Sequence, residues 1–80
     1  MDVGTAVRQR ILNLCKQRGI TVNRLSYLCG LTQSTLNNIT GGRNKSMTVA
    51  TLKKICDGFE ITIRDFFDDP LFDALEQEIR

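Results

Sequence analysis

The chain has 80 residues, of which 41% are hydrophobic and 25% charged, and its formal net charge is +2. This length allows one small domain, and this composition disfavours a disordered chain. No apolar run approaches the roughly 18 residues of a membrane span, and the first residues lack the order of a secretory signal, so we expect a cytoplasmic protein.

The first predicted helix spans about residues 4–18 and ends at Gly19. Its apolar residues recur at the spacing of one helix face, and they are Val7, Ile11, Leu14 and Cys15. The basic residues fall away from this stripe: Arg8, Arg10, Lys16 and Arg18.

Residues 21–42 predict two short helices joined by a tight corner, and this pair is the core of the expected domain. Leu25 and Cys29 lie one turn apart on the first helix. Leu36 and Ile39 lie one turn apart on the second. Two narrow apolar stripes can therefore face each other across the corner.

The corner and the outer face of its second helix suggest a binding surface. Gly30 suits a bend that needs a positive φ angle, and the Thr32 hydroxyl can cap the following helix. The outward positions carry uncharged groups that donate and accept hydrogen bonds: Gln33, Ser34, Asn37 and Asn38. Reading base edges in a DNA major groove requires such a surface.

A glycine-initiated loop at residues 41–47 follows and bears Arg43, Asn44 and Lys45. Its amides and cations are candidates for contacts with a phosphate backbone. A plain solvated connection is the alternative.

Two more helices complete the expected domain. Thr48 is placed to cap a fourth helix that stops at Gly58, and its inward residues are Val49, Leu52, Ile55 and Cys56. Thr62 and Asp65 resemble a capping box that opens a short fifth helix.

An acidic C-terminal helix is predicted over residues 69–80, with Asp69 as its cap and Pro70 at its first position. Its apolar side would carry Leu71, Phe72, Leu75 and Ile79. These residues either dock on their own domain or join two subunits, and the sequence leaves both possibilities open.

Charge is distributed unevenly along the chain. Residues 1–54 carry nine Lys or Arg and one acid, whereas residues 55–80 carry eight acids, Arg64 and Arg80. Such a division of charge is expected for a protein whose basic part binds a polyanion while its acidic part stays away from it. Chance clustering of charges on a solvated surface is the alternative.

The three cysteines, Cys15, Cys29 and Cys56, all fall at inward positions, so we expect them in the core, with a redox-sensing thiol as the alternative. There is no histidine and no CxxC pair. We therefore expect no metal site, no cofactor and no enzymatic activity.

Four segments occur in a characteristic order: Thr21-Val22-x-x-Leu25-Ser26, Gly30-Leu31-Thr32, Thr40-Gly41-Gly42 and Leu52-x-x-Ile55-Cys56-x-Gly58-Phe59. With them, residues 20–67 resemble the helix-turn-helix domain of the lambda-repressor-like (Xre/Cro) family of bacterial and phage regulators. The resemblance implies an all-α, five-helix fold, here with a short extra C-terminal helix, in a single domain over residues 1–80.

The resemblance also implies roles for individual residues. Gln33 would be the main base reader, since a glutamine amide pairs with adenine N6 and N7. Ser34 and Asn38 would be secondary readers. The candidates for phosphate contacts are Thr32, Thr35, Asn37, Arg43, Asn44 and Lys45.

Three positions depart from the family pattern. Val22 stands where the family often has a glutamine that touches a phosphate. The family's pair between a first-helix arginine and a glutamate maps to Cys15 and Thr40, so we expect that pair to be absent.

The predicted function is that of a sequence-specific regulator of transcription that binds double-stranded DNA as a homodimer, with a recognition helix at about residues 32–40. An antitoxin or adaptor that binds another protein through the acidic C-terminal helix is the alternative.

Overall fold

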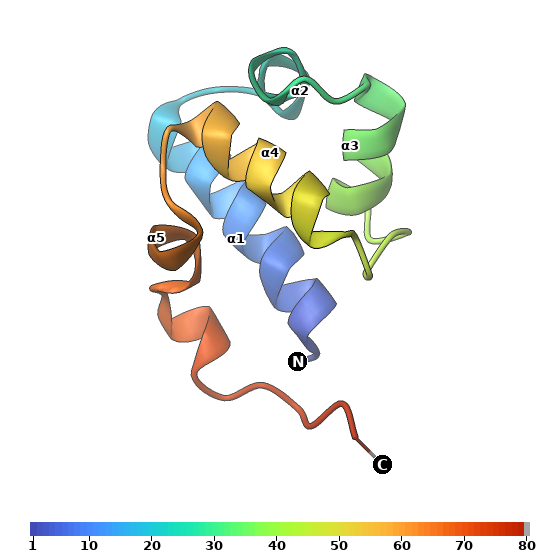
Figure 1. Ribbon diagram of the computed structural model, residues 1–80, viewed down its shortest axis with the longest axis vertical. Helices are drawn as coiled ribbons and strands as arrows, with labels where there is room; N and C mark the ends of the chain where they lie inside the picture. The colour runs from blue at the N-terminus through green and yellow to red at the C-terminus, as the bar shows by residue number, and fades with distance from the viewer. Residues whose placement is uncertain (80) are drawn as a thin grey trace.

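The computed structural model describes residues 1–79 as a small bundle of short helices (Figure 1). The elements are α1 (Val3–Arg18), α2 (Val22–Cys29), α3 (Gln33–Thr40), α4 (Val49–Phe59), α5 (Ile63–Phe67) and one turn of 3₁₀ helix, η1 (Pro70–Phe72). No strand occurs in residues 1–79, so the all-α prediction is confirmed. Within the same range no helix has the length and apolarity to cross a membrane.

All five α-helices begin at a side chain that accepts a hydrogen bond from the backbone N–H three residues further on. These capping residues are Asp2, Thr21, Thr32, Thr48 and Thr62. Because first-turn amides have no partner inside the helix, such caps fix where each helix starts. The caps expected from the sequence at Thr32, Thr48 and Thr62 are confirmed.

The core draws on all five α-helices and contains the apolar stripes expected from the sequence. Its buried members are Val7, Ile11, Leu14, Cys15, Leu25, Cys29, Leu36, Ile39, Leu52, Ile55, Cys56, Phe59 and Phe66. Val49 was expected to point inward, and this prediction was wrong, since the residue is 73% exposed. It is the first residue of α4, and its side chain is not part of the buried core.

The three cysteines are buried and unpaired, as core packing requires. Burial raises the pKa of the Cys15, Cys29 and Cys56 thiols above the ordinary value. The thiolate form is therefore disfavoured at neutral pH, which makes these groups poor nucleophiles in the folded chain.

The end of α4 differs from the prediction in an informative way. The helix continues through Gly58 to Phe59 and ends at Glu60, which adopts a positive φ of 58°. A Cβ atom at Gly58 would lie 2.8 Å from the Cβ of Cys29. The glycine therefore serves the close approach of α2 and α4, and does not terminate the helix.

Arg10 lies off the apolar stripe of α1, and yet it is buried, with 9% of its surface exposed. Its Nε donates to the carbonyl of Phe66 at 2.8 Å, and one terminal nitrogen donates to the carbonyl of Asp65 at 2.9 Å. The other terminal nitrogen lies 3.1 Å from a carboxylate oxygen of Asp69. The side chain thereby ties α1 to the end of α5 and the start of η1.

A C-terminal helix was expected over residues 69–80, of which residue 80 lies outside the described residues. The predicted extent of this helix was wrong. Asp69 caps a helical turn with Pro70 at its first position, but η1 ends at Phe72. Phe72 packs against the core, whereas Ile79 is 79% exposed. A single docked residue gives too little burial to support a longer helix, since isolated helices of about ten residues are marginal in water.

Candidate nucleic-acid interface

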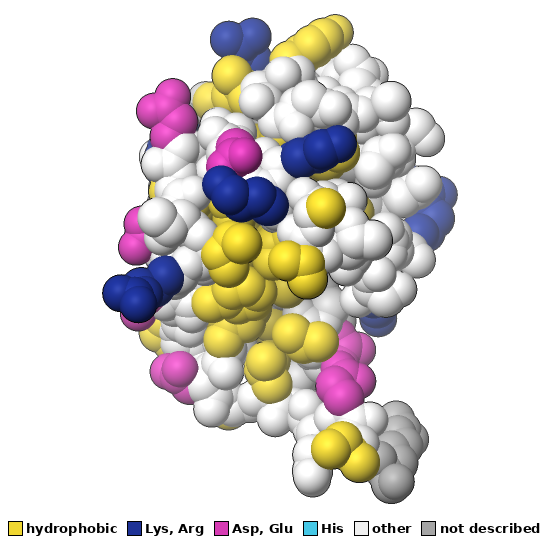
Figure 2. Space-filling view, viewed as in Figure 1, with side chains coloured by type: hydrophobic (Ala, Val, Ile, Leu, Met, Phe, Trp, Pro, Cys, Tyr) yellow, Lys and Arg dark blue, Asp and Glu magenta, His cyan; other side chains and the backbone are white. Residues whose placement is uncertain are grey.

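The helix α3 lies at one side of the molecule, with α1 and α4 between it and α5 (Figure 1). Its residues Leu36 and Ile39 are 0% and 1% exposed and hold it against the core. The opposite face carries exposed polar residues: Gln33, Ser34, Thr35, Asn37 and Asn38. In the space-filling view the surface on this side is mostly neither hydrophobic nor charged (Figure 2).

The corner before α3 is held by backbone bonds. Gly30 adopts a φ of 70°, in agreement with the prediction, and the Leu31 amide donates to the carbonyl of Ser26 at 3.2 Å. Thr32 then caps α3. The angle between α2 and α3 is therefore fixed by local geometry as well as by the core.

Thr32 and Thr35 are both exposed, yet their hydroxyls differ in what they can offer a ligand. The Thr32 hydroxyl accepts from the Thr35 N–H at 3.1 Å and lies 2.8 Å from the Thr35 hydroxyl, to which it donates. Its hydrogen is thus used inside the protein, so it cannot donate to a phosphate oxygen. The Thr35 hydroxyl hydrogen stays free to donate outward.

The loop after α3 is folded back onto the helix. The carbonyl of Asn38 accepts from the amides of Arg43 and Asn44, each at 2.9 Å. The Asn44 side-chain oxygen accepts from the Ser46 amide at 3.0 Å, so this half-buried residue shapes the loop. Arg43 and Lys45 are exposed and place two cations directly after the polar face.

An arginine of α1 does meet the end of α3, although the sequence mapped this position to Cys15. The Arg8 Nε donates to the carbonyl of Thr40. A Cβ atom on Gly42 would lie 3.8 Å from the Arg8 side chain. The family's charge pair is absent from Cys15 and Thr40, as expected, but a different arginine of α1 makes a bond at this joint, and that bond satisfies a carbonyl at the C-terminus of α3.

Tyr27 on α2 was missed by the sequence analysis. It is 69% exposed, and its hydroxyl lies 3.5 Å from the side-chain nitrogen of Gln33. The available signal was its position away from the Leu25 and Cys29 stripe. Val22, in contrast, packs partly buried against the core, which agrees with the loss of a polar contact there.

The acidic C-terminal segment does not cover α3. The Glu76 amide donates to the carbonyl of Met1 at 3.1 Å, and the Glu76 carboxylate lies 3.9 Å from the Met1 ammonium group. Residues 73–79 therefore pass the N-terminal end of α1. The polar face of α3 and the flanking cations remain open to a ligand.

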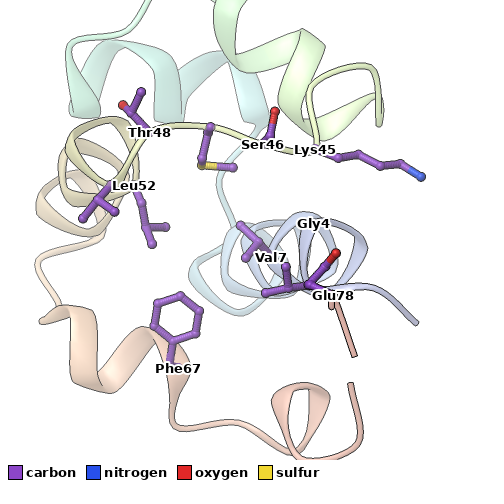
Figure 3. Close-up of a pocket in the computed structure, with 11 residues that line it drawn as sticks. Gly4, Val7, Lys45, Ser46, Thr48, Leu52, Phe67 and Glu78 are labelled. Atoms are coloured by element: carbon purple, nitrogen blue, oxygen red, sulfur yellow. The ribbon is translucent and has the colours of Figure 1, made fainter. Parts of the chain in front are cut away.

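An apolar pocket of about 370 Å³ is a second surface feature. Val7 of α1, Leu52 of α4 and Phe67 of α5 line it from three helices, with Lys45 and Glu78 also in its wall (Figure 3). In the space-filling view it belongs to a hydrophobic patch between these helices (Figure 2). It borders the loop that follows α3.

The Cro/C1-type helix-turn-helix DNA-binding domain matches residues 10–70 of this chain. The chain belongs to this family. In chain order α2, the corner at Gly30 and α3 are its helix-turn-helix, and the resemblance inferred from the sequence is confirmed.

Individual relatives agree with this assignment. The chain is 29% identical over 69 residues to the HTH-type transcriptional regulator PuuR of Escherichia coli K12 and, equally, to that of Shigella flexneri. These matches cover 86% of the chain but 37% of each regulator. The crystal structure of the prophage Lp1 protein 11 is 37% identical, with a TM-score of 0.78, over 94% of this chain and all of that one.

Proposed function

We propose that this chain is a transcriptional regulator that binds double-stranded DNA sequence-specifically by placing α3 in the major groove. The observation that carries the proposal is the two-sided character of α3. Leu36 and Ile39 fix its inner side in the core, and its outer side presents uncharged hydrogen-bonding groups to solvent. A helix with such a face has the width and chemistry to read base edges.

Gln33 is the proposed main base reader, with Ser34 and Asn38 as secondary readers. All three are exposed on the same short helix. A glutamine amide that donates to adenine N7 and accepts from adenine N6 discriminates against other bases by about 1–3 kcal/mol.

The proposed phosphate contacts come from Thr35, Asn37, Arg43 and Lys45, which flank the readers and are exposed. Thr32 and Asn44 have a smaller part in this proposal. The Thr32 hydroxyl is engaged as a cap, and the Asn44 oxygen is engaged in the loop, so Asn44 offers only its amide hydrogens.

Selection of bound duplexes from a random pool tests the proposal. We expect one enriched sequence for the unmodified chain and a steep loss of affinity with rising salt, because cations on phosphates release counterions. Recovery of no preferred sequence, or of single-stranded contaminants alone, would contradict the proposal.

Two substitutions separate reading from anchoring. Gln33→Ala should relax the preference at one base pair, whereas Arg43→Ala, outside the pocket, should weaken binding to all duplexes and lower the salt slope by about one. Arg64→Ala is the matched control, because it removes an exposed cation on α5, across the molecule from α3. Equal losses on selected and random duplexes for Gln33→Ala would remove its role as a reader.

The proposed assembly on DNA is a homodimer, because one such domain covers too few base pairs for useful affinity. The pocket beside the α3–α4 loop is the proposed surface for the second copy. Its wall combines apolar residues with the opposite charges of Lys45 and Glu78, so two copies of the same wall can pair their charges. A second copy bound at this pocket would lie next to the loop at residues 41–47, which is proposed to contact DNA.

Val49→Asp tests this surface, since Val49 lines the pocket and is already 73% exposed, so its folding cost is small. We expect the variant to bind a single half-site but to lose tight binding to two half-sites roughly 34–36 Å apart. Ile79→Asp is the control outside the pocket. Unchanged two-site binding by the Val49 variant would exclude this surface.

The antitoxin or adaptor alternative depended on an acidic C-terminal helix. Within residues 69–79 the only helical turn is Pro70–Phe72, so no observation favours this alternative.

A further inference from the structure

Arg8 on α1 carries a positive charge that the proposed function does not use. Its Nε donates to the carbonyl of Thr40, the last residue of α3. The side chain is partly buried, and no ion pair within residues 1–79 includes it. Charges that are partly removed from water are usually paired with an opposite charge. The described chain thus leaves this guanidinium without a counter-charge.

The remaining donors of Arg8 are open to solvent. A guanidinium has five N–H groups, and the bond to Thr40 engages only the one on Nε. Within residues 1–79 no buried side-chain nitrogen lacks a hydrogen-bond partner. The two terminal nitrogens of Arg8 have no partner in that part of the chain, so they cannot be buried. Four N–H groups are therefore available to a ligand.

The place of this guanidinium is set before any ligand binds. Its Nε is held by the Thr40 carbonyl, and its stem lies beside Gly42, where a Cβ atom would be 3.8 Å from both Cδ and Nε. An arginine that a ligand must order loses side-chain entropy on binding. Because Arg8 is already held at the C-terminal end of α3, less of this entropy is lost there.

A second guanidinium lies beside the same turn. A Cβ atom on Gly41 would be 3.9 Å from a terminal nitrogen of Arg43. Arg8 and Arg43 thus flank the glycine pair at residues 41–42, although like charges repel each other. No ion pair in residues 1–79 includes Arg43. Two cations gathered at one turn without a carboxylate match a polyanion, and planar guanidinium groups suit phosphate oxygens.

We propose that Arg8 binds a phosphate of the DNA backbone through its terminal nitrogens, at the C-terminal end of α3 and beside Arg43. This inference rests on the proposed function of α3 as the DNA-reading helix. It adds α1, which lies outside the helix-turn-helix, to the DNA-binding surface. Phosphates are the same at every base pair, so the contact carries no sequence information. Its effect is expected in affinity and salt dependence, and not in base preference.

The test uses a duplex with a single half-site of the selected sequence, so that pairing of two copies does not enter the measurement. Arg8→Met keeps a long side chain and removes its charge. We expect a roughly tenfold loss of affinity, the scale of one hydrogen bond to a charged group, and a salt slope lower by about one. Arg64→Met, an exposed cation on α5, is the matched control and should change neither quantity.

Neutral methylphosphonates, placed one at a time along the same duplex, locate the phosphate. At one position the neutral group should weaken binding by the unmodified chain but not by Arg8→Met, because that variant has already lost the charge that makes the contact. Arg8→Gln is the second variant for the same comparison if Arg8→Met does not fold. Selection from the random pool should return the same bases for the variant and the unmodified chain.

Two results would overturn the inference. One is an unchanged salt slope in Arg8→Met, which would show that the residue only holds the end of α3. The other is a set of methylphosphonate effects that is the same in the variant and in the unmodified chain. Failure of the proposed function gives a different result, since the unmodified chain would then select no duplex at all.

Discussion

The helix α3 and the C-terminal segment from Asp69 onward begin alike and end differently. Thr32 and Asp69 each accept a hydrogen bond from a backbone amide at the start of a turn. The helix α3 then runs for eight residues, whereas η1 ends after three. The two differ in burial, since Leu36 is 0% exposed and Ile79 is 79% exposed.

The comparison teaches that a cap permits a short helix but does not maintain it. Eight residues are too few for a stable isolated helix in water, so α3 depends on the two apolar side chains that it buries. The C-terminal segment has an apolar pattern of the same kind, but its last apolar residue meets no core. Its first turn is held by Arg10 and by Phe72.

The largest effect in this comparison is expected from Leu36→Ala. The substitution should lower the free energy of unfolding by about 2–5 kcal/mol, because it leaves a cavity under α3. Thermal or denaturant unfolding measures the loss. Leu71→Ala, in the partly exposed C-terminal segment, is the control, and an equal loss there would contradict the contrast in burial.

A smaller but measurable loss in the free energy of unfolding is expected from Arg10→Ala. The variant leaves the carbonyls of Asp65 and Phe66 and the carboxylate of Asp69 without their cationic partner. We expect roughly 1.5–3 kcal/mol of destabilisation in denaturant unfolding. Arg64→Ala should stay within about 0.5 kcal/mol of the unmodified chain, since surface changes away from such networks have little effect. A matching small change for Arg10→Ala would show that the buried network contributes little.

The cap of α3 is expected to contribute about 1 kcal/mol. Thr32→Ala removes the oxygen that accepts from the Thr35 amide, while Thr32→Ser keeps it. Denaturant unfolding should therefore separate the two variants by this amount. If both variants unfold at the same denaturant concentration, the cap is not what fixes the start of α3.

No measurable loss of stability is expected from Ile79→Ser. The side chain is exposed and supports no helix, so the free energy of unfolding should change by less than about 0.5 kcal/mol. A loss of several kcal/mol in thermal unfolding would mean that the C-terminal segment docks more firmly than its exposure indicates.

The sequence predicted the helices and most of their caps because these signals are local. A threonine before an apolar stripe, as at Thr32 and Thr48, acts through amides three residues away. The polar face of α3 followed from the same spacing. The structure places Gln33, Ser34 and Asn38 together on that exposed face, while their individual roles stay predictions.

The features that the sequence did not predict depend on distant partners. Arg10 is 55 residues from Asp65 along the chain, so the helical pattern of the first helix could not indicate that it is buried. Gly58 was expected to end a helix. Its actual role, the close approach to Cys29 of α2, could not be seen in the sequence because that contact exists only in the folded chain. The same reason applies to Tyr27, which meets Gln33 only once the corner at Gly30 is formed.

The most direct test of the account is an NMR titration of the isotope-labelled chain with a duplex that carries a single half-site of the sequence recovered from the random pool. We predict that the amide shifts concentrate between Thr32 and Lys45, and that amides beyond Phe72 stay unchanged. Shifts confined to α5 and the C-terminal segment, with α3 unaffected, would contradict the claim that the polar face of α3 binds DNA.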